Sequence, residues 1–332
     1  MKKIFLFGIM LLMLITTGCG KYTKDNIIKD IEKKIDKLSA YKLTATLEIL
    51  NNEEVYNYDA EVSFKKDDLY KVSLTNTSNN YEQIILKNKN GVYVLTPSLN
   101  KSFKFQSDWP NNNSQIYLLQ SIIDDIKSDK NVSFKEKNNK YVFTAKVNYP
   151  NNKKLVKQDI YFSKKLKLEK VKVYNEDGVA VMTMKVKNVD YSPTFKKSSF
   201  QVNEALKSST TKETTKKAGV IEDTIYPLAL PTGTKLVSEE KIDKTNGNRI
   251  IMTFDGEKPF LLVEETATAE EEMTIIPTYG EPYMLMDTVG AMTDNSLTWT
   301  TGGIEYYLVS DVLNQSELLN IAQSINVLPT MK

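Results

Sequence analysis

Regular alternation of apolar and polar residues over most of the first two hundred positions is the feature that most constrains this chain. A period of two places successive side chains on opposite faces of an extended strand. Polar turns such as Asn51-Asn52 and Lys89-Asn90-Gly91 separate the alternating stretches, as they do in hairpins. The pattern predicts strands at residues 41–50, 55–64, 69–75, 81–87, 91–96, 140–147, 156–163, 167–175 and 179–189. Strands at such short spacing favour one strongly curved antiparallel sheet.

Two stretches change from this alternation to helical spacing. The first, residues 24–38, has Asp25 as its predicted N-cap and an apolar face made of Ile27, Ile28, Ile31, Ile35 and Leu38. The second has Ser114 as its predicted N-cap and an apolar stripe made of Ile116, Leu118, Leu119, Ile122, Ile123 and Ile126. In the second helix Asp124, Asp125 and Lys127 are expected to face water. Helices of this kind can cover the concave face of a curved sheet, which predicts an α+β fold: a half-open antiparallel β-barrel with covering helices.

The segment before the second helix interrupts the strand pattern. Pro110 cannot donate a ladder hydrogen bond, so it ends the strand that carries Phe103 and Phe105. One interpretation is a crossover helix packed inside the curved sheet, with Trp109 as a core anchor. The other is that helix and sheet border a cavity or a groove for a partner. The candidate partner or cavity residues are Phe103, Phe105, Trp109, Pro110, Ser114, Gln115 and Tyr117.

The composition changes after about residue 205, which predicts a second domain. Residues 206–220 are rich in Ser, Thr and Lys without an apolar period and are interpreted as a flexible linker. Residues 221–332 predict a smaller α+β domain, in which Leu297–Ser310 forms a hairpin around Gly302-Gly303. Asn314 and Glu317 predict a capping box at the start of a final helix. The methionines are more typical of core filling than of an adaptable binding surface; they are Met273, Met284, Met286 and Met292.

The N-terminus predicts export and lipidation. Lys2 and Lys3 precede an unbroken apolar run, and small residues lead to Cys19, as in a signal peptide over residues 1–18. The ending Thr16-Thr17-Gly18-Cys19 resembles a bacterial lipobox, although Thr16 stands where Leu is usual. The resemblance implies cleavage before Cys19 and a diacylated thioether, which holds a protein firmly on a membrane. The alternative is an ordinary secretory signal with a chance cysteine. No second cysteine exists for a disulfide, which favours lipidation.

Charge is distributed unevenly along the chain. Residues 19–206 hold 32 basic and 23 acidic side chains, a surplus of nine positive charges. Residues 207–332 hold 10 basic and 19 acidic side chains, a surplus of nine negative charges. The halves could attract each other, or each could face a different partner, and the basic half suits anionic lipid headgroups. Interleaved Lys and Asp/Glu make a nucleic-acid surface a poor interpretation.

The residue inventory argues against an enzyme. Histidine is absent, which removes the commonest general base and metal ligand, and the single cysteine is assigned to lipid. Adjacent carboxylates occur at Asp67-Asp68, Asp124-Asp125 and Glu270-Glu271-Glu272, but such pairs are usually solvated. No glycine-rich phosphate loop occurs. The sequence therefore predicts no catalytic residues, no metal and no cofactor.

Residues 86–129 resemble the YdcC/GerS family of lipoproteins from spore-forming Firmicutes, within the LolA/LolB-like superfamily. The residues that carry the resemblance are Tyr93, Thr96-Pro97, the run from Phe103 to Pro110, Ser114-Gln115 and Tyr117-Leu118. The resemblance covers about residues 20–205 and implies a half-open antiparallel barrel with helices over its mouth. The end of the chain, with Trp299, Gly303, Tyr306 and Leu318–Ile325, resembles a C-terminal module of uncharacterised function from Gram-positive lipoproteins.

The family resemblance implies a role in sporulation or germination. Its germination lipoprotein binds a cell-wall amidase that processes spore-cortex peptidoglycan, which implies a non-enzymatic, partner-binding function here. The location expected is the outer face of the cytoplasmic membrane or a forespore membrane. The alternative is a carrier or sensor of hydrophobic lipid or lipoprotein cargo in the half-barrel, which predicts an accessible lined cavity. A lipid anchor argues against ferrying cargo, so a binding scaffold is the favoured hypothesis.

Overall fold

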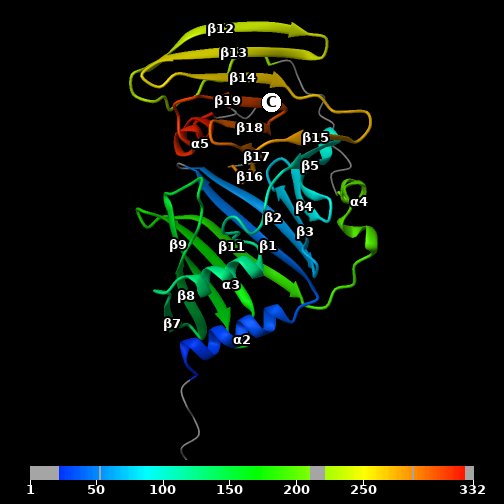
Figure 1. The fold of residues 1–332 in the computed structure, drawn as a ribbon, viewed down its shortest axis with the longest axis vertical. Coiled ribbons are helices and arrows are strands. Elements are labelled where there is room, and N and C mark those ends of the chain that lie inside the picture. Colours follow the sequence, from blue (N-terminus) through cyan, green and yellow to red (C-terminus); the bar gives the residue numbers. More distant parts are fainter. Residues whose placement is uncertain (1–21, 52–53, 210–220, 286–287, 326–332) are drawn as a thin grey trace, which may run out of the picture.

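The computed structural model describes residues 22–51, 54–209, 221–285 and 288–325. The predicted signal peptide 1–18, Cys19, Met286 and most of the predicted linker lie outside the described residues. Two sheets make up the molecule, with the N-terminal helix at one end of its long axis and the second sheet at the other (Figure 1).

The first sheet contains eleven strands from the first two hundred residues, and the alternating sequence explains most of them. They are β1 (Ala40–Asn51), β2 (Glu54–Lys65), β3 (Leu69–Asn76), β4 (Glu82–Asn88), β5 (Gly91–Thr96), β6 (Lys101–Phe105), β7 (Ser133–Lys137), β8 (Lys140–Lys146), β9 (Leu155–Ser163), β10 (Leu168–Asn175) and β11 (Ala180–Asp190). Only β7 was not predicted, because its sequence, SFKEK, carries a single apolar side chain.

These strands are antiparallel to their neighbours and form an open, curved sheet. The order is β6-β5-β4-β3-β2-β1-β11-β10-β9-β8-β7. In the middle of the sheet β1, which forms a hairpin with β2, pairs on its other side with β11, the last of these strands in the sequence. Burial alternates along β1 from Tyr41 onward, where one face is in the core and the other is half-exposed. The predicted half-open antiparallel barrel is confirmed.

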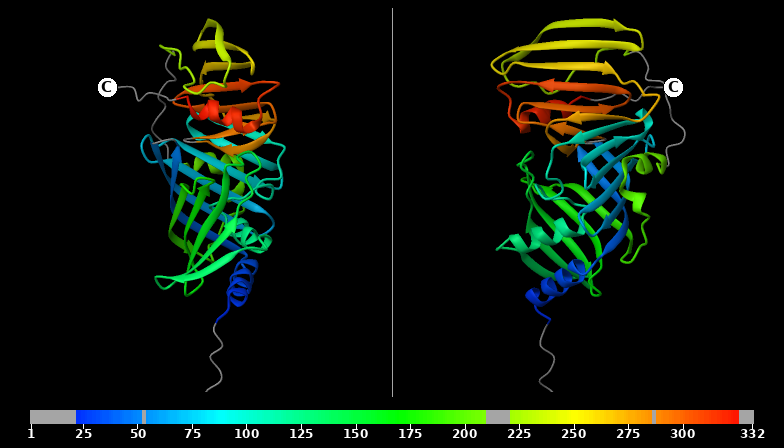
Figure 2. Two further views of the ribbon diagram at one scale, coloured as in Figure 1. Left: turned by 90° about the vertical axis from the view of Figure 1, so that its left-hand side faces the viewer. Right: turned by 45° about the vertical axis from the view of Figure 1, so that its right-hand side comes forward.

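Two helices fill the concave face of this sheet, α2 (Lys24–Asp36) and α3 (Leu119–Ser128). Ile27, Ile31 and Ile35 of α2 are buried, as are the four apolar residues of α3, Leu119, Ile122, Ile123 and Ile126. Figure 2 shows both helices lying across the sheet at the end distant from the second sheet.

Both predicted N-caps were wrong. The N-cap of α2 is Thr23, whose hydroxyl accepts from the amide of Asn26, and not Asp25. The second helix begins at Leu119 rather than after Ser114, with Leu118 at a cap position that has no side-chain cap. Ile116 and Leu118 are buried, but they belong to the loop before α3. The helical period identified the apolar residues correctly. Ser114 does not cap the helix, because it forms tertiary hydrogen bonds instead.

A short segment covers part of the opposite, convex face. The 3₁₀ turn Lys197–Phe200 and the helix α4 (Val202–Lys207) pack Phe200, Val202 and Ala205 against β4 and β5. Helix α4 continues past residue 205, and Ser209 is still buried, so the start of the predicted linker 206–220 is part of the fold. Residues 210–220 lie outside the described residues.

The second sheet has seven strands in the order β12-β13-β14-β19-β18-β17-β16. They are β12 (Thr234–Lys244), β13 (Gly247–Gly256), β14 (Phe260–Thr266), β16 (Glu281–Met284), β17 (Val289–Met292), β18 (Ser296–Thr301) and β19 (Ile304–Val309). The predicted β18–β19 hairpin is present, and Gly302 and Gly303 both adopt positive φ at its turn. The helix α5 (Gln315–Gln323) begins with the predicted Asn314–Glu317 capping box and packs its apolar side on this sheet.

One strand from the C-terminal part crosses into the first sheet. β15 (Thr274–Thr278) pairs in parallel with β6 and becomes the edge of a twelve-stranded sheet. Val289 and Ala291 of β17 also belong to the same apolar cluster as the half-barrel. The described residues from 221 onward are therefore not a free-standing unit beside the half-barrel but are built onto its rim.

Candidate functional site at the junction of the two sheets

The loop between β6 and α3 is anchored by an aromatic side chain. Trp109 is 1% exposed, and its ring meets the edge of Tyr70 with centroids 5.9 Å apart. The row continues through Phe64 to Tyr41, with stacking distances of 5.1 and 5.2 Å. The Trp109–Pro110 peptide bond is cis. The prediction of Trp109 as a core anchor is confirmed.

A buried polar network holds the other end of this loop. The Ser114 hydroxyl donates to Asp125 Oδ1 at 2.8 Å, and Gln158 Nε2 of β9 donates to Asp125 Oδ2 at 2.6 Å. Ser114 also pairs with the backbone of Asn148 through both its amide and its hydroxyl oxygen. Asp125, expected to face water, instead points inward. Burial raises its pKa to about 6, against the opposing effect of the two donors.

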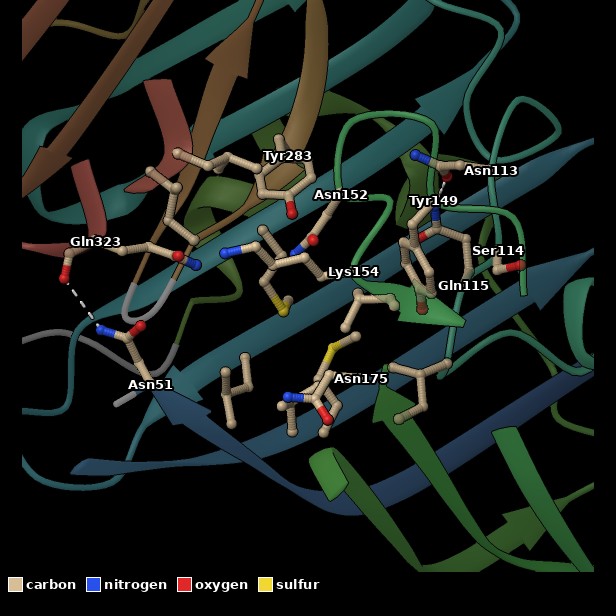
Figure 3. Close-up of a pocket in the computed structure, with 18 of the residues that line it drawn as sticks. Asn51, Asn113, Ser114, Gln115, Tyr149, Asn152, Lys154, Asn175, Tyr283 and Gln323 are labelled. Carbon is tan, nitrogen blue, oxygen red and sulfur yellow. Dashed lines mark hydrogen bonds between the residues drawn. The ribbon is translucent and has the colours of Figure 1, made fainter. Parts of the chain in front are cut away.

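A cavity of about 280 Å³ lies where this loop, the ends of β1 and β11, and the second sheet meet. Its apolar lining comes from both sides of the junction and includes Ile49, Ile85, Ile116, Leu155, Met182, Met284, Leu285 and Leu319. Amide side chains form much of the remaining wall, and Figure 3 shows them converging from separate elements: Asn51, Asn113, Gln115, Asn152, Asn175 and Gln323. Such a site can hold an apolar group and hydrogen-bond a polar one.

Tyrosines and one lysine complete the polar part of the cavity wall. Tyr149 and Tyr283 face it from the two sides, and burial raises the pKa of Tyr283 to about 12, so its hydroxyl stays protonated. Lys154 donates to Asn320 Oδ1 of α5 at 3.3 Å. Asn51 Nδ2 donates to the carbonyl of Gln323 at 3.2 Å. The cavity wall therefore also ties α5 to the half-barrel.

Buried polar contacts fix the second sheet on the first. Gln83 of β4 accepts from the Thr288 hydroxyl at 3.0 Å and from the amide of Val289, and its Nε2 donates to the Val289 carbonyl. Glu281 of β16 accepts from Ser107 and, at 2.6 Å, from Asn112 Nδ2 in the β6–α3 loop. The loop is thus held from both sheets at once, which limits its freedom.

The structure separates the predicted site residues into two groups. Ser114, Gln115 and Tyr117 line the cavity, which matches part of the cavity hypothesis in position. The other four do not line it: Phe105, Trp109 and Pro110 are buried in the sheet–loop core, and Phe103 is half-buried against it. Cys19 lies outside the described residues.

Sequence reasoning missed the wall residues that come from other segments. Tyr149, Asn152 and Lys154 belong to the β8–β9 connection, and Tyr283 belongs to a strand that no alternation indicated. No sequence signal pointed to Asn51 or Gln323, because isolated amides at strand and helix ends are common.

The adjacent carboxylates found in the sequence lie in a strand turn, on α3 and in the loop before β15. Asp67 and Asp68 occupy left-handed positions in the β2–β3 turn, and Asp68 pairs with Lys87 at 2.6 Å. Glu270 supports the chain leading to β15 through backbone bonds with Leu99 and Asn100. Among the described residues no cluster of acidic side chains has the geometry of a metal site, and no helix there is long and apolar enough to cross a membrane.

A buried acid of the second sheet has a different environment from Asp125. Glu264 of β14 is fully buried, and burial raises its pKa to about 7. One carboxylate oxygen accepts from the amide of Ile225 at 3.2 Å, while the other has no hydrogen-bond partner within the described part of the chain. The side chain of Asn248 accepts from the backbone amide of Ile221 and donates to its carbonyl. Glu264 and Asn248 therefore together hold the segment from Ile221 to Ile225 on the second sheet.

The fold and junction define a class: an open half-barrel filled by its own helices, with a second sheet built onto its rim. The chain belongs to the family described as sporulation protein YdcC-like, whose model it matches over residues 1–200. It is 39% identical to the sporulation protein YdcC of Bacillus subtilis over 318 residues, which is 95% of this chain and 94% of the relative. The predicted family relationship is confirmed.

Similarity to solved structures is much weaker. The complex of the CwlD amidase with the GerS lipoprotein from Clostridioides difficile gives 21% identity and a TM-score of 0.24, covering 52% of this chain and 98% of that one. A LolA superfamily protein from Nitrosomonas europaea gives 10% identity and a TM-score of 0.31, covering 53% and 98%. At these scores neither likeness bears on what this chain binds.

Proposed function

We propose that this protein is a non-enzymatic, lipid-anchored lipoprotein of sporulation or germination that binds and supports a cell-wall enzyme, such as an amidase of the spore cortex. Cys19 is the proposed lipidation site. The proposed location is the outer face of the cytoplasmic membrane or a forespore membrane.

Family membership carries the sporulation part of this proposal, since the relative at 39% identity is named a sporulation protein. The packing of the half-barrel supports a scaffold over a carrier. Side chains of α2 and α3 occupy its concave face, where Ile27, Ile31 and Ile122 are almost completely buried. A carrier of acyl chains needs that space open, whereas a scaffold gains rigidity from filling it.

The β6–α3 loop is the surface we assign to the partner. Gln106, Asp108 and Asn111 are exposed on it, while Trp109 and Ser114 hold it from within. A loop clamped by the half-barrel and by Glu281 loses little conformational entropy when a partner binds.

Recovery of the intact lipoprotein from sporulating cells, with mass spectrometry of bound proteins and lipids, tests this function. A wall enzyme at stoichiometric yield is expected with the natural chain. The pair Asp108→Arg and Asn111→Arg should lose it, whereas Asp243→Arg and Asn246→Arg, exposed at the far edge of the second sheet, should keep it. Bound acyl lipid without any protein partner would overturn the proposal.

One observation favours a second candidate, a carrier or sensor of acyl lipid. The junction cavity is lined by both apolar and polar side chains, which suits an amphiphile. It lies at the rim and not inside the half-barrel, so a ligand there would touch both sheets. Lipid recovered from the natural chain and absent from a Met182→Trp variant would support this candidate.

A further inference from the structure

Opposite charges lie at opposite ends of this molecule. The second sheet and α5 belong to the part of the chain with nine surplus negative charges, and the half-barrel belongs to the part with nine surplus positive charges. Figure 1 places the second sheet at one end of the long axis and α2 at the other. The chain therefore has an electric dipole along its length, and Tyr22, the first described residue, lies against α2 at the positive end.

The start of the described chain is seated on this positive end. Tyr22 donates to Asp30 of α2, and its ring lies 6.1 Å from that of Tyr141 on β8. Only Gly20 and Lys21 separate Tyr22 from Cys19. Three extended residue steps span about 11 Å at most, so an acyl group on Cys19 would bring this end of the molecule against the bilayer.

Three segments meet at this end: α2, residues 135–140 around the β7–β8 turn, and residues 164–170 around the β9–β10 turn. Lys34 of α2 joins the last of them by donating to the carbonyls of Lys165 and Leu166. Together the three segments, with Lys37 directly after α2, carry 12 lysines and 6 acidic residues, a surplus of six positive charges. They account for most of the surplus of the half-barrel region.

The acids of these segments are largely engaged, which leaves lysines without counterions. Glu32 pairs with Lys127, Glu136 with Lys164, and Glu169 with Lys140. Asp30 accepts from Tyr22, and Asp25 and Asp36 remain exposed. Seven exposed lysines have no ion pair among the described residues: Lys29, Lys33, Lys37, Lys135, Lys137, Lys165 and Lys167.

Neighbouring positive charge affects the pKa of one lysine in these segments. Burial, and then the nearby charge of Lys167, lower the pKa of Lys34. Uncompensated positive charge on one face is relieved by an anionic surface. Anionic headgroups attract such lysines within a Debye length of the bilayer.

We propose that these seven lysines, the basic end, rest on anionic phospholipid headgroups and stand the molecule upright on the membrane. The acidic second sheet and the junction cavity then face away from the bilayer, toward the wall. This orientation rests on the proposed anchoring through Cys19, but the basic end itself binds without the acyl group.

Vesicle sedimentation of the unacylated chain tests the basic end. The chain starts at residue 19 and carries Cys19→Ser, and the vesicles contain either equal phosphatidylglycerol and phosphatidylcholine or phosphatidylcholine alone. Binding is expected only to the anionic vesicles, and it should fall steeply with added salt. Changing Lys29, Lys33, Lys165 and Lys167 together to Gln should weaken it more than tenfold.

A matched control removes the same charge elsewhere. Lys153, Lys157, Lys235 and Lys241 are exposed and lie outside the three segments, and changing all four to Gln should alter binding less than twofold. Equal losses from the two variants, or binding to neutral vesicles, would overturn the basic end. The mass of the mature N-terminus from native membranes reports Cys19 acylation separately, so failure of the anchor and failure of this surface are distinguishable.

Discussion

The concave face of the half-barrel and the junction beside it share strands, but side chains fill the concave face, whereas the junction contains a cavity. The filled face is covered by helices with continuous apolar stripes, and its largest residues, such as Trp109 and Phe143, are almost completely buried. The junction is lined by side chains from separate loops, many of them amides, and it keeps a cavity of about 280 Å³. The core of the half-barrel is therefore tightly packed, whereas the junction keeps room for a ligand.

Trp109→Ala is expected to give the largest effect. It removes a buried indole from the aromatic row and leaves a cavity, which costs about 3–5 kcal/mol of unfolding free energy. Urea denaturation followed by circular dichroism measures the loss. Phe103→Ala, at a half-buried position on the same segment, should cost clearly less. A loss below about 1 kcal/mol for Trp109→Ala would contradict the anchor role.

Gln83→Ala tests how strongly the junction is held. It leaves the buried amide of Val289 without its side-chain acceptor, at a cost of about 1–3 kcal/mol. Hydrogen exchange should accelerate in β17 while the amides of β8 and β9 stay protected. Lys185→Ala, which removes only an exposed ion pair with Glu48, is the control and should leave exchange unchanged. Equal acceleration in both regions would mean that the two sheets unfold as one unit.

Overpacking compares the filled face and the hollow directly. Ile123→Phe inserts a larger ring into the core under α3 and should cost about 1–3 kcal/mol. Met182→Phe places a ring against the junction cavity, where space exists, and should cost less than about 1 kcal/mol. Thermal unfolding of both variants measures the difference. Similar costs would show that the cavity wall is as tightly constrained as the core.

The two inward-pointing acids, Asp125 and Glu264, give the smallest expected effects, which are measured as the pH dependence of stability. The folded-state pKa of Asp125, about 6, lies above its ordinary value of 3.8, so folding takes up protons between these values. Its contribution to stability is present below about pH 4 and is lost as pH rises through 6. Glu264 behaves likewise between 4.5 and about 7.

Denaturation midpoints measured between pH 4 and pH 7 test whether these two carboxyls have the raised pKa values. Asp125→Asn should flatten the loss of stability between pH 4 and 6, and Glu264→Gln should flatten it up to pH 7. Because Asp125 lies on α3 and Glu264 on β14 of the second sheet, the effects should add in the double variant. A pH profile unchanged by both substitutions would contradict the inward placement of these carboxyls.

Much of the fold followed from the sequence alone. The period of two located all but one strand of the half-barrel, since alternation records which face of a strand is buried. The helical stripes named the residues that fill the concave face. The β18–β19 hairpin and the Asn314–Glu317 capping box were predicted because turn and cap chemistry is local. Trp109 was recognised as a core residue, and Ser114, Gln115 and Tyr117 of the predicted site residues line the junction cavity.

Tertiary structure alone decided the rest. Ser114 has the chemistry of an N-cap, yet it bonds Asp125 and Asn148 because the loop folds back between α3 and β9. The β15 strand joins the first sheet in parallel, a long-range pairing that no local pattern announces. The junction cavity needs residues more than two hundred positions apart, such as Asn51 and Gln323. The sequence by itself identified most of the buried side chains, because its periodicity marks the buried face of each strand and helix. Which of the buried or polar groups contact one another was decided only by packing.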